Sequence, residues 1–411
     1  MTQIDVRRLN LLDGRFYADD PWPAYRWLRD EQPVYRDEAN GLWGISRYHD
    51  VVEIEKHPTR YSSASGSRPR IDPQASMIDS DDPAHQSRRR MVARRFTPKA
   101  VKQAEADVRK VATRLIDKVA PRGECEVVRD LAAPLPAAVI GQKLGFPPEL
   151  WDKCREWSEF TMHDGGQYPR DGSVPEATGR TIDAVLEFAV ETMAIVAARR
   201  AEPRDDLISV WANQELDWPD GSRRRMTDDE LVSEALLILD GGAETTRSVI
   251  GTMCVELIRH PDQRALLIDN PAILAKTGVE EFIRWVSPLL NMARTATEDH
   301  ELHGVEIKAG DELLLMYASA NRDDRVFEDP ERFDVKRAHN LHVAFGFGTH
   351  FCLGASLARL EIKVMFEELL HRLPDMRLAP GADPQIVPAA FSRAYDSVPV
   401  EFTPSPVSAR D

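Results

Sequence analysis

Residues 228–259 constrain the fold most strongly, because they are predicted to form one unusually long helix. Thr227, followed three residues later by Glu230, has the pattern of a capping box at a helix start. Pro261 marks the other end, since a proline disfavours helical backbone in the residue before it. A helix of this length would extend about 48 Å. It must therefore cross the whole of a 411-residue protein.

The middle of this segment is predicted to be buried, because residues 235–239 are Ala-Leu-Leu-Ile-Leu and are apolar on nearly every side. The next residues, 240–246, are Asp-Gly-Gly-Ala-Glu-Thr-Thr. Each glycine costs a helix about 1 kcal/mol relative to alanine. Buried carboxylates and hydroxyls cost more unless they have hydrogen-bond partners. Such a local conflict is typical of a functional site.

The remaining periodicity predicts a mainly α protein with a few short strands. Apolar residues at helical spacing indicate helices near 99–119, 131–145, 176–200, 272–286 and 354–372. Alternating segments indicate strands near 33–36, 42–47, 303–307, 312–316 and 397–403. Because no repeat or long linker divides the chain, we expect a single domain over 1–411, with minor β-rich parts near the N-terminus and at 295–320 and 380–405.

Charge and hydropathy exclude several classes of function. A net charge of −15 argues against nucleic acid as the main partner. No stretch of 18 apolar residues is present, so stable membrane insertion is not expected. The first residues, MTQIDVRRLNLLDG, lack the apolar core of a signal peptide, which predicts a cytoplasmic protein. The four cysteines are scattered and form no CxxC pair, which argues against structural zinc and disulfides.

One of these cysteines lies in an unusual loop. Residues 345–354 read Phe-Gly-Phe-Gly-Thr-His-Phe-Cys-Leu-Gly and precede a predicted helix. The glycines permit close backbone approaches, and the positive end of the helix favours the thiolate form of Cys352. The three phenylalanines would exclude water. The pattern predicts a thiolate held against a flat, apolar group; the alternative is a glycine-rich turn around a buried structural cysteine.

The whole loop matches the FGxGxHxCxG haem-ligand signature and resembles that of the cytochrome P450 superfamily. The resemblance covers almost the entire chain. It includes Gly-Gly-Ala-Glu-Thr-Thr at 241–246, Glu281-Phe-Ile-Arg284, and Asp-Pro-Glu-Arg-Phe at 329–333. It implies a triangular helical prism with a long central helix and a small β-rich region. The haem would be sandwiched between that helix and the Cys352 loop.

The resemblance also implies how the cofactor is held. Heme b would take the thiolate of Cys352 as its axial ligand. The residues that would bind its propionates are His85, Arg89, Arg294 and His342, and Phe345, Gly346 and Gly354 would complete the loop around it. His350, although it lies in the signature, is expected to face the redox-partner side.

Proton delivery is implied for the acid and alcohol of the long helix. Glu244 would relay protons, and the Thr245 hydroxyl would hold dioxygen and a nearby water, with a distorted helix at Gly241 and Gly242 making room. The hydroxyl of Thr246 is expected to bond back to its own helix. A buried network of Glu281, Arg284 and Arg332 is expected to be structural.

Electrons must come from another protein, because the sequence contains no recognisable flavin, nicotinamide or iron–sulfur domain. The basic helix that carries Arg89 borders the thiolate face in the family. Arg88, Arg90 and Arg94 are therefore expected to attract an acidic ferredoxin, which a ferredoxin reductase would serve. A solvated charge run is the alternative for Arg94 and Arg95.

The substrate pocket can be predicted only by position within the resemblance. Its walls would come from Met77, Ile78, Leu237, Asp240, Gly241, Leu290, Met292 and Phe391, and from the segment near 157–175. Most of these residues are apolar, which predicts a hydrophobic small-molecule substrate. Asp240 is the exception: it could meet a polar substrate group or a water, or face another helix.

Several stretches, including Asp-Gly-Arg-Phe-Tyr at 13–17, 128–136 and 402–406, are similar to bacterial enzymes that oxidise the terminal methyl of the cholesterol or cholestenone side chain. This resemblance implies an O2-dependent monooxygenase that hydroxylates an unactivated C–H bond. Fatty acids, terpenoids and polyketides are alternative substrates. A peroxygenase or isomerase, which needs no electron donor, and a non-catalytic haem sensor are the alternative classes of function.

Overall fold

The fold is organised around helix α11, which runs from Asp228 to Arg259 in the computed structural model. The structure describes residues 9–164, 176–218 and 221–407. The predicted capping box is confirmed: Glu230 Oε2 accepts from the Thr227 N–H at 2.7 Å, and Thr227 Oγ1 accepts from the Glu230 N–H. The helix is continuous through Gly241 and Gly242, without a break at the distortion expected there.

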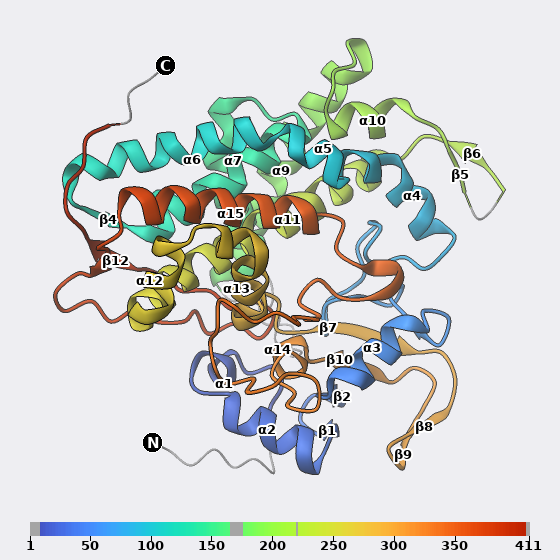
Figure 1. Cartoon of the computed structure of the whole chain (residues 1–411). Coiled ribbons are helices and arrows are strands. Elements are labelled where there is room, and N and C mark those ends of the chain that lie inside the picture. Colours follow the sequence, from blue (N-terminus) through green and yellow to red (C-terminus); the bar gives the residue numbers. More distant parts are fainter. Residues whose placement is uncertain (1–8, 165–175, 219–220, 408–411) are drawn as a thin grey trace.

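Long helices pack around α11 and bury nearly all of it. They include α7 (Pro134–Leu144), α8 (Trp151–Glu159), α9 (Glu176–Ala201) and α15 (Ala355–Arg372), and α6 (Glu105–Val119) packs in turn on α7 and α15. Contact with α7 is so close that a Cβ on Gly242 would lie 2.7 Å from Ile140 Cγ1. A side chain at this position would push the two helices apart. The largest apolar core lies among these helices, which gather on one side of the molecule in Figure 1.

Shorter helices complete the α-helical part. Their bounds are α1 Gly14–Ala18, α2 Trp22–Glu31, α3 Tyr48–Lys56, α4 Ala84–Val92, α5 Pro98–Gln103, α10 Leu207–Asn213, α12 Pro261–Asp269, α13 Val279–Val286 and α14 Tyr317–Ala320. π-helical turns occur at 128–132, before α7, and at 160–164 and 274–278, between longer helices. None of the helices in the described ranges is long and apolar enough to cross a membrane.

A small mixed sheet forms the other side of the molecule (Figure 1). Its order is β1 (Val34–Asp37), β2 (Leu42–Ile45), β10 (Glu312–Leu315), β7 (Met292–Ala296) and β3 (Tyr61–Ser62). Strand β10 pairs in parallel with β2 and antiparallel with β7. The second sheet contains β11 (Arg377–Leu378), β12 (Pro399–Glu401) and β4 (Glu124–Glu126). Hairpins are formed by β5 (Leu216–Asp217) with β6 (Arg223–Arg224), and by β8 (His300–Leu302) with β9 (Val305–Ile307).

The predicted fold class, mainly α with minor β-rich parts, is confirmed. Each predicted helix and strand has a counterpart, although the 99–119 segment is divided into α5 and α6. Strand β7, which carries Arg294, lies in a segment to which no strand was assigned from sequence. The assignment of 1–411 to one domain stays a prediction.

Candidate active site

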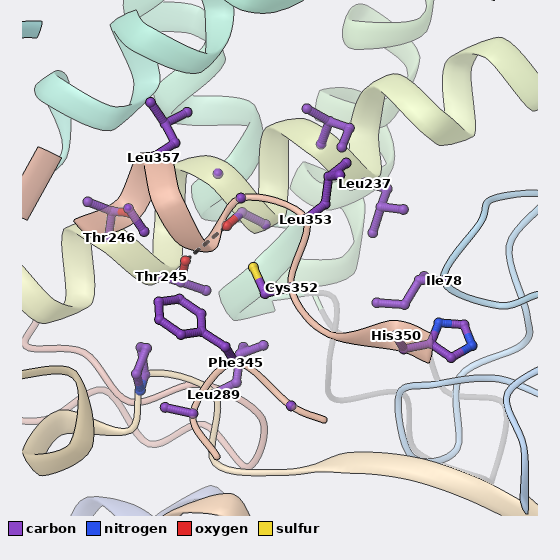
Figure 2. Close-up of a pocket in the computed structure, with 18 of the residues that line it drawn as sticks. Ile78, Leu237, Thr245, Thr246, Leu289, Phe345, His350, Cys352, Leu353 and Leu357 are labelled. Carbon is purple, nitrogen blue, oxygen red and sulfur yellow. Dashed lines mark hydrogen bonds between the residues drawn. The ribbon is translucent and has the colours of Figure 1, made fainter. Parts of the chain in front are cut away.

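A cavity lies between the middle of α11 and the loop that precedes α15. Its volume is about 210 Å³, and residues from α3, α4, α7, α11, β7 and α15 contribute to its wall. Figure 2 shows the Cys352 sulfur in the middle of this group, with Thr245 and Thr246 on one side and His350 on the other. The predicted placement of the Cys352 loop opposite the long helix is confirmed.

The loop holds Cys352 by backbone contacts. Gly346 and Gly348 have φ angles of +67° and +69°, and a Cβ on Gly348 would lie 2.3 Å from the Glu55 carbonyl oxygen. Only glycine can occupy such a position without moving the neighbouring helix α3. The Cys352 N–H donates to the Phe345 carbonyl at 2.8 Å. Gly346, Phe345, Cys352 and Gly354 all line the cavity, as predicted.

The environment of the Cys352 sulfur favours the thiol in the protein alone. Burial raises the pKa of this thiol, and the backbone N–H groups of Gly354 and Ala355, with Arg89, counteract only part of the shift. The helix end was expected to favour the thiolate, but desolvation outweighs it. A thiolate at this position therefore requires a cation beside the sulfur.

The other three cysteines are buried and unpaired, as the sequence suggested. Burial raises the pKa of Cys125 and of Cys154 to about 12, and it raises the pKa of Cys254 further. Their sulfurs behave as small apolar side chains. Cys352 is the only one of the four that lines the cavity.

Positive and imidazole side chains converge on one edge of the cavity. His85, Arg89, Arg294 and His350 all line it, and the rings of His85 and His350 lie 4.1 Å apart. Burial, followed by the nearby Arg294, lowers the pKa of His350 to about 3. His85 Nε2 is buried and has no hydrogen-bond partner. This edge can bind negatively charged oxygens.

The positions of His342 and His350 differ from those that the sequence suggested. His342 does not line the cavity; its Nε2 lies 3.0 Å from Glu280 Oε2, which also receives Arg359. Its assignment to a propionate stays a prediction that this contact does not support. His350, expected to face the redox-partner side, lies in the cavity wall instead.

Glu55 and Tyr317 were not identified from the sequence and lie beside Arg294. Glu55 Oε1 accepts from the Tyr317 hydroxyl at 2.7 Å and from Arg294 Nη2 at 3.2 Å. Burial raises the pKa of Glu55, although Arg294 and Tyr317 oppose the shift. The three residues come from α3, β7 and α14, so no local sequence pattern could have shown that they meet.

The acid and hydroxyl residues of α11 between 240 and 246 are all buried or line a cavity, but their partners differ from expectation. The hydroxyl of Thr245 donates to the Gly241 carbonyl at 2.9 Å, which is the back-bonding expected for Thr246. Thr246 instead bonds the side chain of Glu361 on α15. Glu244 Oε2 accepts from Arg247 Nη1 at 2.5 Å. No neighbouring atom lies within 4 Å of the point where a Cβ on Gly241 would be. The missing side chain of Gly241 therefore leaves open space in the cavity at this point of α11.

The predicted structural network is present with one different member. Both nitrogens of the Arg284 fork donate to Glu281 at 2.8 Å, and both side chains are fully buried. Arg332 was expected to be the third member, but 65% of its side chain is exposed and only its backbone carbonyl takes part. Arg337 takes its place, with Nε 3.1 Å from Glu281 Oε2. Arg337 is five residues further along the chain and outside the motif that suggested Arg332.

The predicted substrate residues divide between two adjoining cavities. Met77, Ile78, Leu237, Gly241 and Met292 line the main cavity. Asp240 and Phe391 line a smaller one of about 60 Å³ beside it. The assignment of Leu290 was wrong: it packs in the N-terminal core cluster, and Leu289 faces both cavities. Of the segment near 157–175, residues 165–175 lie outside the described residues.

The basic helix α4 presents fewer cations to solvent than predicted. Arg88 was expected to be a docking residue, but it is 6% exposed. Its guanidinium pairs with Glu230 at 2.9 Å and Glu234 at 3.1 Å on α11. Arg88 is thus a buried link between two helices. Arg90 and Arg94 are exposed, as expected.

Comparisons with known proteins agree with this geometry. The family model described as Cytochrome P450 matches residues 274–389. A steroid C26-monooxygenase of Mycobacterium tuberculosis is 47% identical over 97% of this chain and 98% of its own length. A steroid C26-monooxygenase of Mycolicibacterium smegmatis is 45% identical over 98% of this chain and 99% of its own length. The crystal structure of a Bacillus megaterium cytochrome P450 in complex with testosterone has a TM-score of 0.85 and 31% identity, covering 95% of this chain and 99% of that one.

Proposed function

Because this chain belongs to the cytochrome P450 family, and is a monooxygenase of that family, we propose that it hydroxylates the terminal methyl group of a steroid side chain. The observation that carries this proposal is the near full-length match to two steroid C26-monooxygenases, at 45% and 47% identity. The largely apolar cavity is consistent with a steroid, since hydrophobic walls with a few polar groups are typical of such sites.

The residues around the main cavity fit the haem that the family implies. Cys352 provides a sulfur, and the buried, unpartnered Nε2 of His85 can donate to an anionic oxygen once the ring is protonated, because Nδ1 already donates to Asp82 Oδ1. We assign the ligand to Cys352 and the cofactor to heme b. Arg89, Arg294, His85 and His350 would hold its propionates, because arginine can bind a carboxylate with two hydrogen bonds. When bound, haem activates O2 and transfers one oxygen atom into a C–H bond.

Thr245 and Glu244 would handle protons on the α11 side of the cavity. Since the Thr245 hydroxyl donates its hydrogen to Gly241, its lone pairs remain available to accept from a polar group in the cavity. Glu244 is 2% exposed and is paired with Arg247, so it can deliver protons only if its side chain moves from this pair. Phe345 and Leu353 would keep bulk water from the sulfur.

Monooxygenases of this family need O2 and redox partners. We assign the electron donor to a ferredoxin with its reductase, and the docking surface to the exposed Arg90 and Arg94. Phe347 and Phe351 were expected to exclude water but are 40% and 42% exposed, and they would add apolar contacts to a docking surface. A reduction rate that falls with added salt supports docking there, because screened charges steer association less. A flat salt response excludes this surface.

A Soret titration of the holoenzyme with cholest-4-en-3-one, a long-chain fatty acid and a macrolide tests the substrate class. We expect the steroid alone to shift the spin state, and product analysis to place the new hydroxyl on the terminal methyl. A shift with the fatty acid and none with the steroid would contradict the proposal. The reduced, carbon monoxide-bound spectrum tests thiolate ligation by Cys352.

Two further measurements separate the alternative classes of function. A peroxygenase or isomerase would form product without a ferredoxin, whereas we expect turnover to depend on the electron donor. A haem sensor would bind the steroid without consuming NAD(P)H in the reconstituted system. Steroid-dependent NAD(P)H consumption with matching product is the expected outcome.

A further inference from the structure

The small second cavity forms a polar end to the main one. The two share wall residues, among them Leu237, Gly241 and Thr245, so a ligand in the main cavity can reach both. Apart from the edge that carries His85, Arg89, Arg294 and His350, the main cavity is lined chiefly by apolar side chains. In the smaller one, Asp240 of α11 faces Arg68 from the loop before α4. This pair is the strongest departure from an apolar substrate wall.

Asp240 is buried but incompletely paired. It is 3% exposed; its Oδ1 accepts from the Thr161 hydroxyl at 2.7 Å, and its Oδ2 lies 3.5 Å from Arg68 Nη2. A carboxylate can accept about four hydrogen bonds, so Asp240 has capacity for a ligand. Burial raises the pKa of Asp240 to about 7, and Arg68 and Thr161 offset only part of that shift.

Arg68 is held in place with its donors near the same space. Its guanidinium stacks on the Phe391 ring at 4.9 Å, and Nη2 lies 2.9 Å from the Met162 sulfur. Its contact with the Thr161 carbonyl is long, at 3.5 Å. Thioether sulfur is a weak acceptor. The stacking fixes the side chain while leaving strong hydrogen bonds to be made.

We propose that Asp240 and Arg68 form a polar subsite that binds a hydroxyl group of the substrate, which donates to Asp240 and accepts from Arg68. A hydroxyl is the group that satisfies both partners at once. A carboxylate would face Asp240, and a bare hydrocarbon would leave the remaining hydrogen-bonding capacity of Asp240 and Arg68 unused. This inference rests on the proposed steroid function and narrows its substrate class.

The position of the subsite fixes where on the steroid this hydroxyl lies. Asp240 precedes Thr245 by five residues, which is about 7.5 Å along the helix axis. With the terminal methyl beside Thr245, the subsite is too close to receive the oxygen at carbon 3, at the far end of the ring system. It is placed for a hydroxyl on ring C or D, such as one at carbon 12.

A purely structural role is the competing interpretation. The bond from Thr161 links α11 to the turn at 160–164, and Asp240 could serve only to hold these segments together. Removal of either partner would then reduce stability, but it would not change which steroid is preferred. Ligand preference, and not stability or total activity, therefore separates the two roles.

The test is a Soret titration of the holoenzyme with two matched steroids, 5β-cholestane-3,7,12-triol and 5β-cholestane-3,7-diol. They differ only in the 12-hydroxyl, and both keep the terminal methyl. We expect the triol to bind about tenfold or more tightly, the size of one hydrogen bond to a charged group. In Asp240→Leu the preference should fall to about twofold or less. In Thr161→Val, the matched control, it should persist.

Each of the other outcomes contradicts either the subsite alone or both the subsite and the proposed steroid function. Equal affinities for the two steroids, with hydroxylation of both at the terminal methyl, contradict the subsite and leave the proposed function intact. An unchanged preference in Asp240→Leu also contradicts the subsite. If neither steroid shifts the Soret band while a fatty acid does, both the subsite and the steroid function are wrong.

Discussion

The hydroxyl of Thr245 donates to the carbonyl oxygen of Gly241, one helical turn earlier, at 2.9 Å. This bond commits the hydrogen of Thr245 and orients its oxygen toward the cavity, where Gly241 has no side chain to obstruct it. Thr245 therefore acts as an acceptor for whatever polar group occupies that space.

Thr245→Ala removes this acceptor, so proton delivery should become uncontrolled and reducing equivalents should be lost as peroxide. We expect product formed per NAD(P)H consumed to fall severalfold. The carbon monoxide spectrum should stay unchanged, because Cys352 is not touched. Thr245→Ser keeps the hydroxyl and is the matched control; it should retain most of the coupling. Equal coupling in the alanine variant and the wild type would refute the role.

The buried network around Glu281 predicts that the Arg337 side chain contributes to the stability of the fold and that the Arg332 side chain does not. Arg337→Ala removes donors to Glu281 and to three backbone carbonyls. It should lower the free energy of unfolding by about 1.5–3 kcal/mol. Arg332→Ala removes a mostly exposed side chain and should cost about 0.5 kcal/mol or less. Urea unfolding of both variants decides the matter, and a larger loss for Arg332→Ala would contradict the network.

The neighbouring glycines of α11 should respond differently to alanine. Gly241→Ala gains about 1 kcal/mol of helix propensity and meets no atom, but it occupies cavity space. We expect higher thermal stability and weaker steroid binding. In Gly242→Ala the new Cβ meets Ile140 at 2.7 Å, and overpacking costs about 1–3 kcal/mol. Gly242→Ala should therefore be the less stable variant in a thermal melt, and the reverse order would contradict the packing of α7 on α11.

Glu361 should make the protein less stable as the pH rises. Burial raises its pKa to about 8, despite the hydrogen bond from Thr246, from an ordinary value of 4.5. Between these pH values the unfolded state binds fewer protons than the folded state, so the free energy of unfolding falls with pH. The slope is at most about 1.4 kcal/mol per pH unit. This destabilisation is absent below pH 4.5 and complete above pH 8.

Glu361→Gln keeps the shape and removes the titration, so it should flatten this slope. The measurement is urea unfolding of both proteins at several pH values between 5 and 8. Glu234 and Asp240, whose pKa values are also raised to about 7, contribute equally to both proteins and cancel in the difference. Parallel curves for the two proteins would show that Glu361 is not the group responsible.

Local chemistry explains which parts of the molecule could be predicted from sequence. The bounds of α11 follow from Thr227, Glu230 and Pro261, and each of these signals acts within a few residues. The Cys352 loop is equally local, because its glycines are required by the backbone angles of that same segment. Motif and structure agree there for a physical reason.

The errors concern pairings between distant segments. His342 and His350 are eight residues apart in one connection, and only the packing of α13 and α4 against it decides which faces the cavity. Arg88 carries the same charge as Arg90, but the turn of α4 directs it at Glu230 and Glu234. Helical periodicity identifies a face; it does not identify the segment that covers that face.

The arrangement of positions along α11 has an evolutionary consequence. Position 240 reaches the smaller cavity, 241 leaves space in the main one, and 242 sets the spacing to α7. Positions 244 to 247 hold the residues that we propose handle protons and the Glu244–Arg247 ion pair. Because one continuous helix carries all of these positions, a mutation at 240 can alter which ligand fits without displacing the residues one turn later. A duplicated copy of such a gene could acquire a new substrate by one substitution while inheriting its chemistry intact.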